Sequence, residues 1–198
     1  MTAAVVTGAS RGLGRGIAVA LAGAGFDVVV GFHREADGAK ATVAAVEEVG
    51  RRGVAVAGDI TDPVTSRNLL RAAEEDLGGL GSWVNNAGVS VLAPLLDTSA
   101  EELTHMLDVN LFGTFHGLRT AANSFLERGT GGRIVNVASE VGVQAARYLG
   151  GYAATKSAVV GLTQAAALEL AASGSTVNAV CPGTAEADMV LAERRSEM

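Results

Sequence analysis

The chain has 198 residues, of which 48% are hydrophobic and 18% charged, and its formal net charge is −6. This length and composition allow a buried core and exclude a disordered chain. The negative charge and the lack of a dense run of Lys and Arg argue against a nucleic-acid partner, and no unbroken apolar stretch is long enough for a membrane span. The single cysteine excludes an intrachain disulfide and fits a reducing compartment, so we expect a cytoplasmic protein without a signal peptide. The scattered histidines and the cysteine show no metal-ligand spacing.

Short Val- and Ala-rich runs alternate with longer helical patterns along the chain. The expected strands are residues 3–7, 27–31, 54–57, 82–85, 134–138 and 175–180. The expected helices are residues 12–24, 38–49, 63–77, 99–128 and 151–172. Continuously apolar strands separated by helices indicate a parallel sheet that is buried on both faces. We therefore expect a single domain over residues 1–198, with the doubly wound, three-layer α/β/α arrangement of the Rossmann fold.

A glycine-rich segment, TGASRGLG at residues 7–14, joins the first expected strand to the first expected helix. Glycines at positions 8, 12 and 14 let the backbone approach a phosphate, because a Cβ would block that approach. The helix N-terminus behind the segment offers unpaired N–H groups and a partial positive charge to a pyrophosphate. The alternative is a plain connecting turn, and the spacing differs from the common G-x-G-x-x-G, so this segment alone does not decide the function.

The chain contains only two tyrosines and two lysines, and one of each, Tyr152 and Lys156, stand four residues apart among Ala and Gly. On a helix this spacing places both side chains on one face. An ammonium about 4 Å from a phenol, at an effective dielectric of about 20, favours the phenolate by roughly 4 kcal/mol, or about three pKa units. Such a phenol is suited to proton exchange with a carbonyl oxygen at neutral pH. The alternative is a chance pairing on an Ala-rich helix.

Together these motifs resemble the short-chain dehydrogenase/reductase family. The segments at 177–183 and 187–189 are most similar to its 3-oxoacyl-[acyl-carrier-protein] reductase branch. The matching motifs occur in family order: TGxxxGxG at 7–14, NNAG at 85–88, Asn110, Ser139, the Tyr152 and Lys156 pair, and PG at 182–183. The resemblance implies that Tyr152 is the general acid and that Lys156 holds the nicotinamide ribose and lowers the pKa of Tyr152. It further implies that Ser139 donates a hydrogen bond to the substrate oxygen and that Asn110 supports a water-mediated proton relay.

The resemblance also implies a nicotinamide dinucleotide, bound by residues at the ends of the expected strands. These are Gly8, Ser10, Arg11, Gly12, Leu13, Gly14, His33, Arg34, Asp59, Ile60, Asn86, Ala87, Gly88, Tyr152, Lys156, Pro182 and Gly183. Phe32 stands where NAD-using relatives place an acidic residue for the ribose 2′-hydroxyl. The guanidinium groups of Arg11 and Arg34 suit a 2′-phosphate, so we predict NADP(H). NAD(H) is the alternative, and the nearby acidic residues Glu35 and Asp37 are the features that favour it.

The implied reaction is the NADPH-dependent reduction of a ketone to a secondary alcohol. The substrate would be a 3-oxoacyl thioester on a carrier protein, or a related polyketide or simple carbonyl compound. The branch often carries a basic residue just before the sixth strand for carrier binding, whereas residues 171–175 here read AASGS. Arg128, Arg133 or Arg147 would have to take its place. The alternatives are an NAD-dependent alcohol or polyol dehydrogenase, and a dinucleotide-sensing protein without turnover.

Family members are usually homodimers or homotetramers, and the expected contact is through the helices at 99–128 and 151–172. They also usually continue through a further helix and a seventh strand, so we expect this C-terminal segment to be absent here. Of the remaining residues, Tyr148 lacks a lysine four positions on and is expected in a wall of the substrate cleft. His105 and His116 are expected at the surface or in packing contacts, and Cys181 as a small buried residue.

Overall fold

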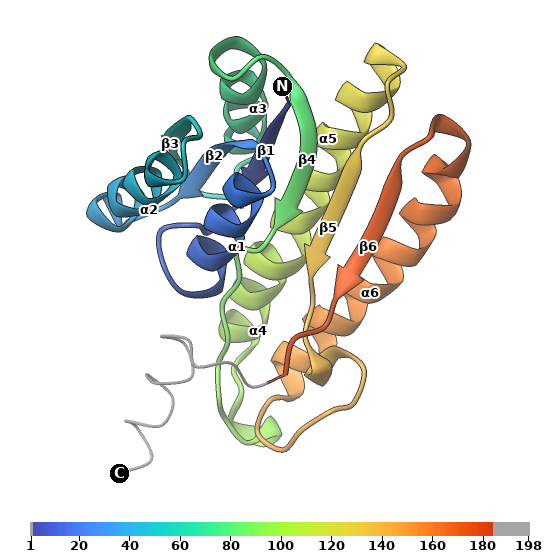
Figure 1. Cartoon of the computed structure of the whole chain (residues 1–198). Coiled ribbons are helices and arrows are strands. Elements are labelled where there is room, and N and C mark those ends of the chain that lie inside the picture. Colours follow the sequence, from blue (N-terminus) through green and yellow to red (C-terminus); the bar gives the residue numbers. More distant parts are fainter. Residues whose placement is uncertain (1, 184–198) are drawn as a thin grey trace.

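A six-stranded parallel sheet with helices on both faces is formed by residues 2–183, the part of the chain that the computed structural model describes (Figure 1). Its strands are β1 (Ala3–Val6), β2 (Asp27–Phe32), β3 (Gly53–Ala57), β4 (Leu80–Asn85), β5 (Arg133–Val137) and β6 (Thr176–Val180). Their order is β3-β2-β1-β4-β5-β6, and all neighbouring strands are parallel. The predicted doubly wound Rossmann fold is therefore confirmed, and its strand order reverses between β1 and β4.

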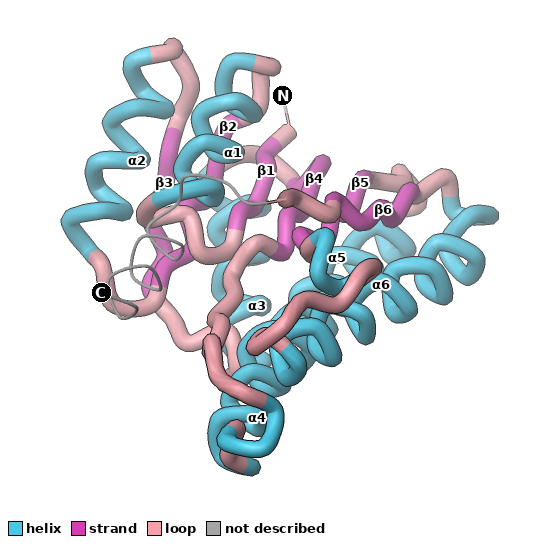
Figure 2. The backbone as a smooth tube through the Cα atoms, turned by 90° about the horizontal axis from the view of Figure 1, so that it is seen from below, coloured by secondary structure: helices cyan, strands magenta, loops and turns pink. Residues whose placement is uncertain are grey.

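The helices complete the three layers. Helices α1 (Gly12–Gly23) and α2 (Ala36–Glu48) lie on one face of the sheet, and α3 (Pro63–Arg71), α5 (Gly113–Arg128) and α6 (Gly150–Leu170) on the other (Figure 2). The short helix α4 (Ala100–Met106) begins at Ser99, whose side chain forms a reciprocal capping box with Glu102. The predicted elements are all present, with ends that differ by one or two residues. None of the described helices is both long enough and apolar enough to cross a bilayer.

Two of the predicted helices each contain a π-helical turn. The helix predicted at 63–77 consists of α3 and the turn Ala72–Asp76, and the helix predicted at 99–128 consists of α4, the turn Leu107–Phe112 and α5. A π-helical turn holds one more residue per turn and thereby shifts the phase of the side chains that follow it. The second turn carries Asn110, which is fully buried.

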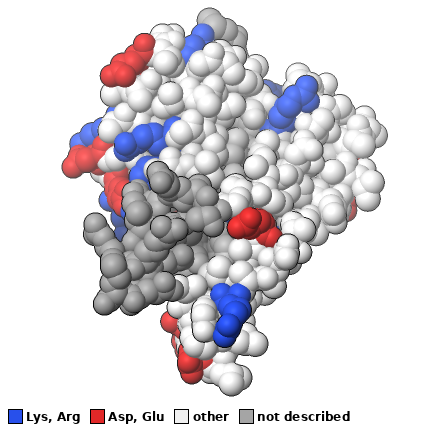
Figure 3. All heavy atoms as spheres, turned by 60° about the horizontal axis from the view of Figure 1, so that its bottom comes forward, with Lys and Arg blue, Asp and Glu red and all other residues white. Residues whose placement is uncertain are grey.

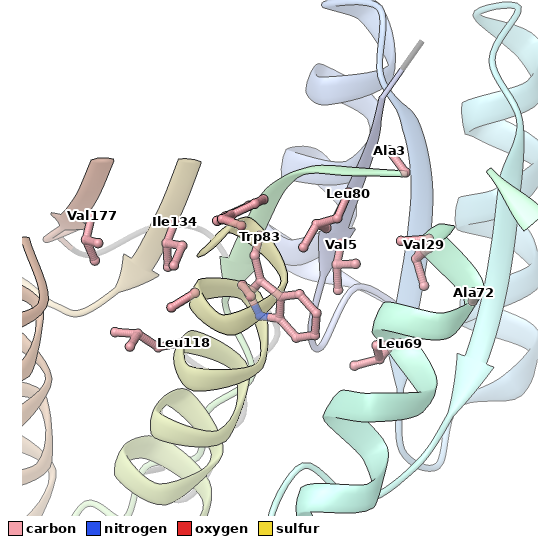
Figure 4. Packing of buried hydrophobic residues seen from close by; sticks show 14 of the residues in the cluster. Ala3, Val5, Val29, Leu69, Ala72, Leu80, Trp83, Leu118, Ile134 and Val177 are labelled. Atoms are coloured by element: carbon pink, nitrogen blue, oxygen red, sulfur yellow. The ribbon is translucent and has the colours of Figure 1, made fainter. Parts of the chain in front are cut away.

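The larger of two hydrophobic clusters lies between the sheet and the helices α3, α5 and α6. Trp83 of β4 is its largest side chain and packs among Val5, Leu69 and Leu118 (Figure 4). A second cluster of mostly Val and Ala lies on the opposite face, towards α1 and α2. Every residue of β1 is buried, which explains why the inner strands are apolar throughout and do not alternate.

A chain of buried hydrogen bonds runs from β4 through β5 to α6. The Trp83 indole N–H donates to Asn85 Oδ1 (2.7 Å), Asn85 Nδ2 donates to Asn136 Oδ1 (2.8 Å), and Asn136 Nδ2 donates to Thr163 Oγ1 (2.9 Å). Because buried polar groups are costly when unpaired, these bonds fix α6 against the sheet in one position.

Cys181 is exposed, so the expectation of a buried cysteine is wrong. It follows β6, which is an edge strand of the sheet in the described part of the chain, and the side chains at the end of an edge strand have neighbours on one side only. The segment at residues 187–189, which contributes to the resemblance to the carrier-protein reductases, lies outside the described residues.

Candidate active site

One cleft of about 620 Å³ runs along the carboxyl ends of the strands. Because all strands are parallel, the loops that follow them meet at this edge, where the reversal of strand order between β1 and β4 opens a crevice. The volume falls in the range of ligand sites in proteins. All the residues that the sequence predicts as dinucleotide contacts line the cleft, from Gly8 in the loop after β1 to Gly183 after β6. Ser139 lines it too, whereas Asn110 does not.

The glycine loop after β1 packs so tightly that side chains are excluded from it. Gly8 has φ of +63° and Gly12 a φ of +52°, a region that favours glycine. A Cβ on Gly8 would lie 2.8 Å from the Cα of Ala87, and a Cβ on Gly14 would lie 2.5 Å from the Asn86 side chain. The loop therefore presents bare backbone at the start of α1, which fits a pyrophosphate.

The loop after β4 holds the glycine loop in place. Asn86 Nδ2 donates to the carbonyl oxygens of Thr7 (3.0 Å) and Gly8 (3.1 Å), and Thr7 Oγ1 accepts from the backbone N–H groups of Asn86 and Ala87. The two asparagines of the NNAG motif thus have separate roles. Asn85 belongs to the buried row of hydrogen bonds that joins Trp83 to Asn136. Only Asn86 reaches the cleft.

The Lys156 side chain reaches from α6 to the end of β5. Its Nζ donates to the carbonyl oxygen of Val137 at 2.8 Å and lies 5.7 Å from the centre of the Tyr152 ring. Lys156 is only 3% exposed. Burial lowers the pKa of Lys156 to about 8, and the nearby Cys181 acts weakly in the opposite direction. The two side chains lie together, as their spacing predicts. Because burial lowers the pKa of Lys156, however, the ammonium is only partly charged near pH 8 and then stabilises a phenolate less than a full charge would.

Ser139 follows β5 and is brought to α6 by a close backbone contact. A Cβ on Gly142 would lie 2.8 Å from the backbone carbon of Lys156, so the short 3₁₀ turn Glu140–Gly142 fits against α6 only without a side chain there. Ser157 Oγ donates to the Gly142 carbonyl oxygen at 2.7 Å and fixes the same contact. The structure therefore places Ser139, Tyr152 and Lys156 around one end of the cleft.

Asn110 lies behind the cleft and not in its wall. Its Nδ2 donates to the Val89 carbonyl oxygen (2.9 Å) and to Thr155 Oγ1 (3.0 Å), and its Oδ1 accepts from the Val89 N–H (2.8 Å). The side chain thereby joins the loop after β4 to α6, between Tyr152 and Lys156. Gly88 permits this arrangement, because a Cβ there would lie 3.2 Å from Asn110 Oδ1 and 3.4 Å from Lys156 Nζ.

Charged groups of both signs line the opposite end of the cleft. Arg11 NH1 lies 3.3 Å from Glu35 Oε1, and His33 Nε2 lies 3.8 Å from Asp59 Oδ2. The backbone N–H of Thr61 lowers the pKa of Asp59 despite partial burial, and the charges of His33 and Arg34 act in the same direction. Both predicted arginines are at this end, but Arg11 already contacts a carboxylate, which sequence spacing does not reveal.

Several lining residues escape prediction from the sequence. His105, expected in a surface or packing role, lines the cleft, as do Val89, Ser90, Glu140 and Leu149. Tyr148, expected in the wall, is not among the lining residues. It has a φ of +66°, a left-handed conformation, and its ring stacks with the Arg147 guanidinium at 5.3 Å. No periodicity or motif in the sequence predicts this left-handed conformation at Tyr148. Within residues 2–183, no three His, Cys, Asp or Glu side chains form a group that could bind a metal ion.

The sequence model of the short chain dehydrogenase family matches residues 2–198. The chain belongs to this family. It is 42% identical over 181 residues to L-2,3-butanediol dehydrogenase of Corynebacterium glutamicum, covering 91% of the chain and 70% of that relative. It is 37% identical over 186 residues to the 3-oxoacyl-[acyl-carrier-protein] reductase FabG of Staphylococcus aureus, covering 94% and 75%. Its structure matches that of acetoin dehydrogenase YohF from Salmonella typhimurium with a TM-score of 0.89 and 31% identity, covering 96% and 74%.

This short-chain dehydrogenase is therefore an NAD(P)-dependent oxidoreductase that acts on small molecules, in a family whose members commonly form oligomers. The resemblance predicted from the motifs is confirmed at the level of the family. The narrower link to carrier-protein reductases is only weakly supported, because the butanediol dehydrogenase is the more similar of the two relatives.

Two glycines of α1 test the packing of the glycine loop in this short-chain dehydrogenase. Gly14→Ala should lower the free energy of unfolding by about 1–3 kcal/mol, because its Cβ would meet Gly8 and Asn86. Gly16→Ala is the matched control: no atom lies within 4 Å of its Cβ position, so the better helix propensity of Ala should raise stability by about 0.5–1 kcal/mol. Chemical denaturation measures both, and equal effects of the two changes would contradict the close approach.

Proposed function

We propose that this protein reduces a small ketone to a secondary alcohol with NADP(H), and that Tyr152 delivers the proton. The observation that carries the proposal is the meeting of Tyr152, Lys156 and Ser139 at one end of a cleft whose other end presents bare backbone at a helix N-terminus. The names of the relatives support small hydroxy ketones and diols as the substrate class. An NAD-dependent alcohol dehydrogenase is the corresponding alternative.

The residues of the cleft fit a nicotinamide dinucleotide. The glycine loop would hold the pyrophosphate at the start of α1, Asp59 and Ile60 would lie beside the adenine, and Pro182 and Gly183 would lie beside the nicotinamide. When bound, the dinucleotide supplies the hydride that reduces the carbonyl carbon. The protein's own groups must therefore bind the ketone, exclude water and deliver one proton to the carbonyl oxygen.

Lys156 and Tyr152 carry the proton chemistry in this proposal. As Tyr152 releases its proton to the ketone oxygen, negative charge develops on its phenol oxygen, and the nearby ammonium of Lys156 stabilises that charge. The hydrogen bond from Lys156 to Val137 fixes the ammonium in place. The Ser139 hydroxyl would donate to the same ketone oxygen, and Asn110 acts as a positioning residue through Val89 and Thr155. The water relay at Asn110 stays a prediction.

The preference for NADP(H) rests on the end of β2. Phe32 stands where an acidic residue would bind the ribose 2′-hydroxyl, and Arg11 and Arg34 line this part of the cleft. A phosphate binds guanidinium groups in charge-assisted hydrogen bonds. Glu35 favours the alternative, NAD(H), because it contacts Arg11.

The substrate end of the cleft suits an uncharged ketone. Among the described lining residues, the Lys and Arg residues are Arg11, Arg34 and Lys156, and both arginines lie at the other end. The carboxylate of Glu140 lies next to Gly183, so an anionic substrate would meet a negative charge. Val89, Val109, Val141 and Leu149 supply apolar wall. These features favour a small, neutral ketone.

Assembly through α5 and α6 is part of the same proposal. Phe112, Phe115 and Leu126, in or just before α5, and Leu168 of α6 are large apolar side chains with substantial exposure. Such residues are more often covered in an oligomer than left in water. A homodimer or homotetramer remains the expected state.

A carrier-bound 3-oxoacyl thioester is the second candidate substrate, favoured by the similarity to FabG. On the face drawn in Figure 3, however, the Lys and Arg side chains on the left lie among Asp and Glu side chains, and the others are isolated, which does not favour an acidic carrier. We expect NADPH oxidation to be faster, in kcat/KM, with diacetyl or acetoin than with a 3-oxoacyl thioester. A higher kcat/KM for the thioester would contradict the small-ketone assignment.

Replacement of Tyr152 by Phe should remove nearly all turnover, by about 10³-fold or more, because the phenol hydroxyl is the proposed proton donor. NADPH binding, followed by nicotinamide fluorescence, should change little. Tyr148→Phe is the matched control, since Tyr148 is the chain's other tyrosine and does not line the cleft. If Tyr152→Phe kept the wild-type rate of NADPH oxidation, the proposed mechanism would be wrong.

The rate of reduction should fall as the pH rises through about 8. Lys156 then loses its proton, because burial lowers its pKa to about 8, and a neutral amine no longer stabilises the developing charge on Tyr152. With diacetyl and saturating NADPH, kcat/KM should decline by up to about tenfold per pH unit above the midpoint. A profile that stays flat to pH 10 would exclude a role for the charge of Lys156.

A further inference from the structure

We propose that Glu35 sets the strength of the NADP(H) preference, because it competes with the 2′-phosphate for Arg11. The inference rests on the proposed function in one respect, namely that a nicotinamide dinucleotide occupies this cleft. Glu35, at the nucleotide end of the cleft, would then be a specificity-determining residue.

The contact between the two groups is open to a ligand. Arg11 NH1 and Glu35 Oε1 are 3.3 Å apart, and the two side chains are 58% and 45% exposed. Both residues line the cleft, next to His33 and Arg34. An ion pair of this kind is weak in water, so a ligand with more negative charge than a carboxylate can displace Glu35 from Arg11.

The backbones that carry the two residues are fixed to each other. Arg15 of α1 donates to the carbonyl oxygens of Ser10 (2.7 Å) and Gly38 (3.2 Å) and to Thr42 Oγ1 (3.0 Å). Thr42 in turn donates to the Ala9 carbonyl oxygen at 2.9 Å. A Cβ on Gly38 would lie 2.7 Å from Ser10 O, so α2 begins in direct contact with the glycine loop.

The same contacts keep the Glu35 carboxylate close to Arg11. Glu35 is the residue just before α2, and Arg11 the residue just before α1. Because these contacts hold the two helix starts together, Glu35 stays near any phosphate that Arg11 binds. Its charge then opposes the phosphate in two ways: it occupies the guanidinium, and it repels the ligand directly.

The effect is selective for one of the two nucleotides. The 2′-phosphate of NADP(H) must share Arg11 with Glu35, whereas the 2′-hydroxyl of NAD(H) carries no charge and leaves the pair intact. Glu35 therefore weakens the binding of NADP(H) and has little effect on NAD(H). The site discriminates less between the nucleotides than Arg11 and Arg34 alone would predict.

The decisive experiment is a titration of the full-length protein with NADPH and NADH, followed by nicotinamide fluorescence. In Glu35→Gln, the Kd for NADPH should fall by about fivefold, the scale of an exposed ion pair, while the Kd for NADH changes by less than about twofold. Asp37→Asn is the matched control: Asp37 is 98% exposed and pairs with Lys40 at 3.4 Å, away from Arg11. It should change either Kd by less than about twofold. Thermal unfolding checks that both variants are folded.

Measurements in an Arg11→Gln variant distinguish competition between Glu35 and the phosphate for Arg11 from direct repulsion between Glu35 and the phosphate. In Arg11→Gln there is no guanidinium to compete for, so adding Glu35→Gln should improve the Kd for NADPH by less than about twofold. If Glu35→Gln still lowered the Kd for NADPH by about fivefold in the Arg11→Gln protein, competition for Arg11 would be excluded. A Kd for NADPH in Glu35→Gln within about twofold of wild type would overturn the inference as a whole.

These outcomes are distinguishable from a failure of the proposed function. A wild-type protein that binds NADH more tightly than NADPH contradicts the proposed cofactor, yet a tighter Kd for NADPH in Glu35→Gln would still support the role of Glu35. A protein that binds neither nucleotide contradicts both.

Discussion

The burial of one cation, the ammonium of Lys156, organises the site more than any other interaction. A buried ammonium is costly unless it is hydrogen-bonded, and here the Val137 carbonyl oxygen at the end of β5 accepts from it. That bond ties α6 to the strand that leads to Ser139. The cost of burial also appears in the lowered pKa of Lys156, which brings its proton into the range of ordinary cellular pH. The same desolvation therefore both constrains the structure and makes the chemistry responsive to pH.

Close backbone approaches supply the second constraint, and they act on the loops after three different strands. Gly8 allows the loop after β1 to touch the loop after β4, Gly88 lets Asn110 and Lys156 come together behind that loop, and Gly142 brings the loop after β5 onto α6. A Cβ on Gly8 or Gly142 would collide with backbone, and a Cβ on Gly88 would press against the Asn110 side chain. These contacts explain why the glycines recur at the site, and they leave the cleft walls rigid where a dinucleotide would meet bare backbone.

The elements that a sequence predicts well are those with a local physical cause. Apolar runs and helical periodicity specify the strands and helices, and the i, i+4 spacing of Tyr152 and Lys156 specifies a shared face. Features that depend on distant residues were missed. Cys181 is exposed because β6 is an edge strand in the described sheet, and Tyr148 has a left-handed backbone that no motif announces. The contact between Arg11 and Glu35 likewise joins two loops separated in sequence, so counting charges near the end of β2 overstates the positive field.

At the nucleotide end of the cleft, the positions of the charged side chains affect nucleotide binding more than their net charge does. Arg11 and Arg34 face two carboxylates, Glu35 and Asp59, so the formal charges of these four groups cancel. Asp59 is held by the backbone N–H and hydroxyl of Thr61, and its lowered pKa keeps it ionised, which leaves it little freedom to respond to a ligand. Within residues 2–183, the contact recorded for the Glu35 carboxylate is the exposed ion pair with Arg11. Of the two acids, Glu35 is therefore the one whose interactions a bound phosphate can rearrange, and discrimination between the nucleotides depends on the free energy of that rearrangement.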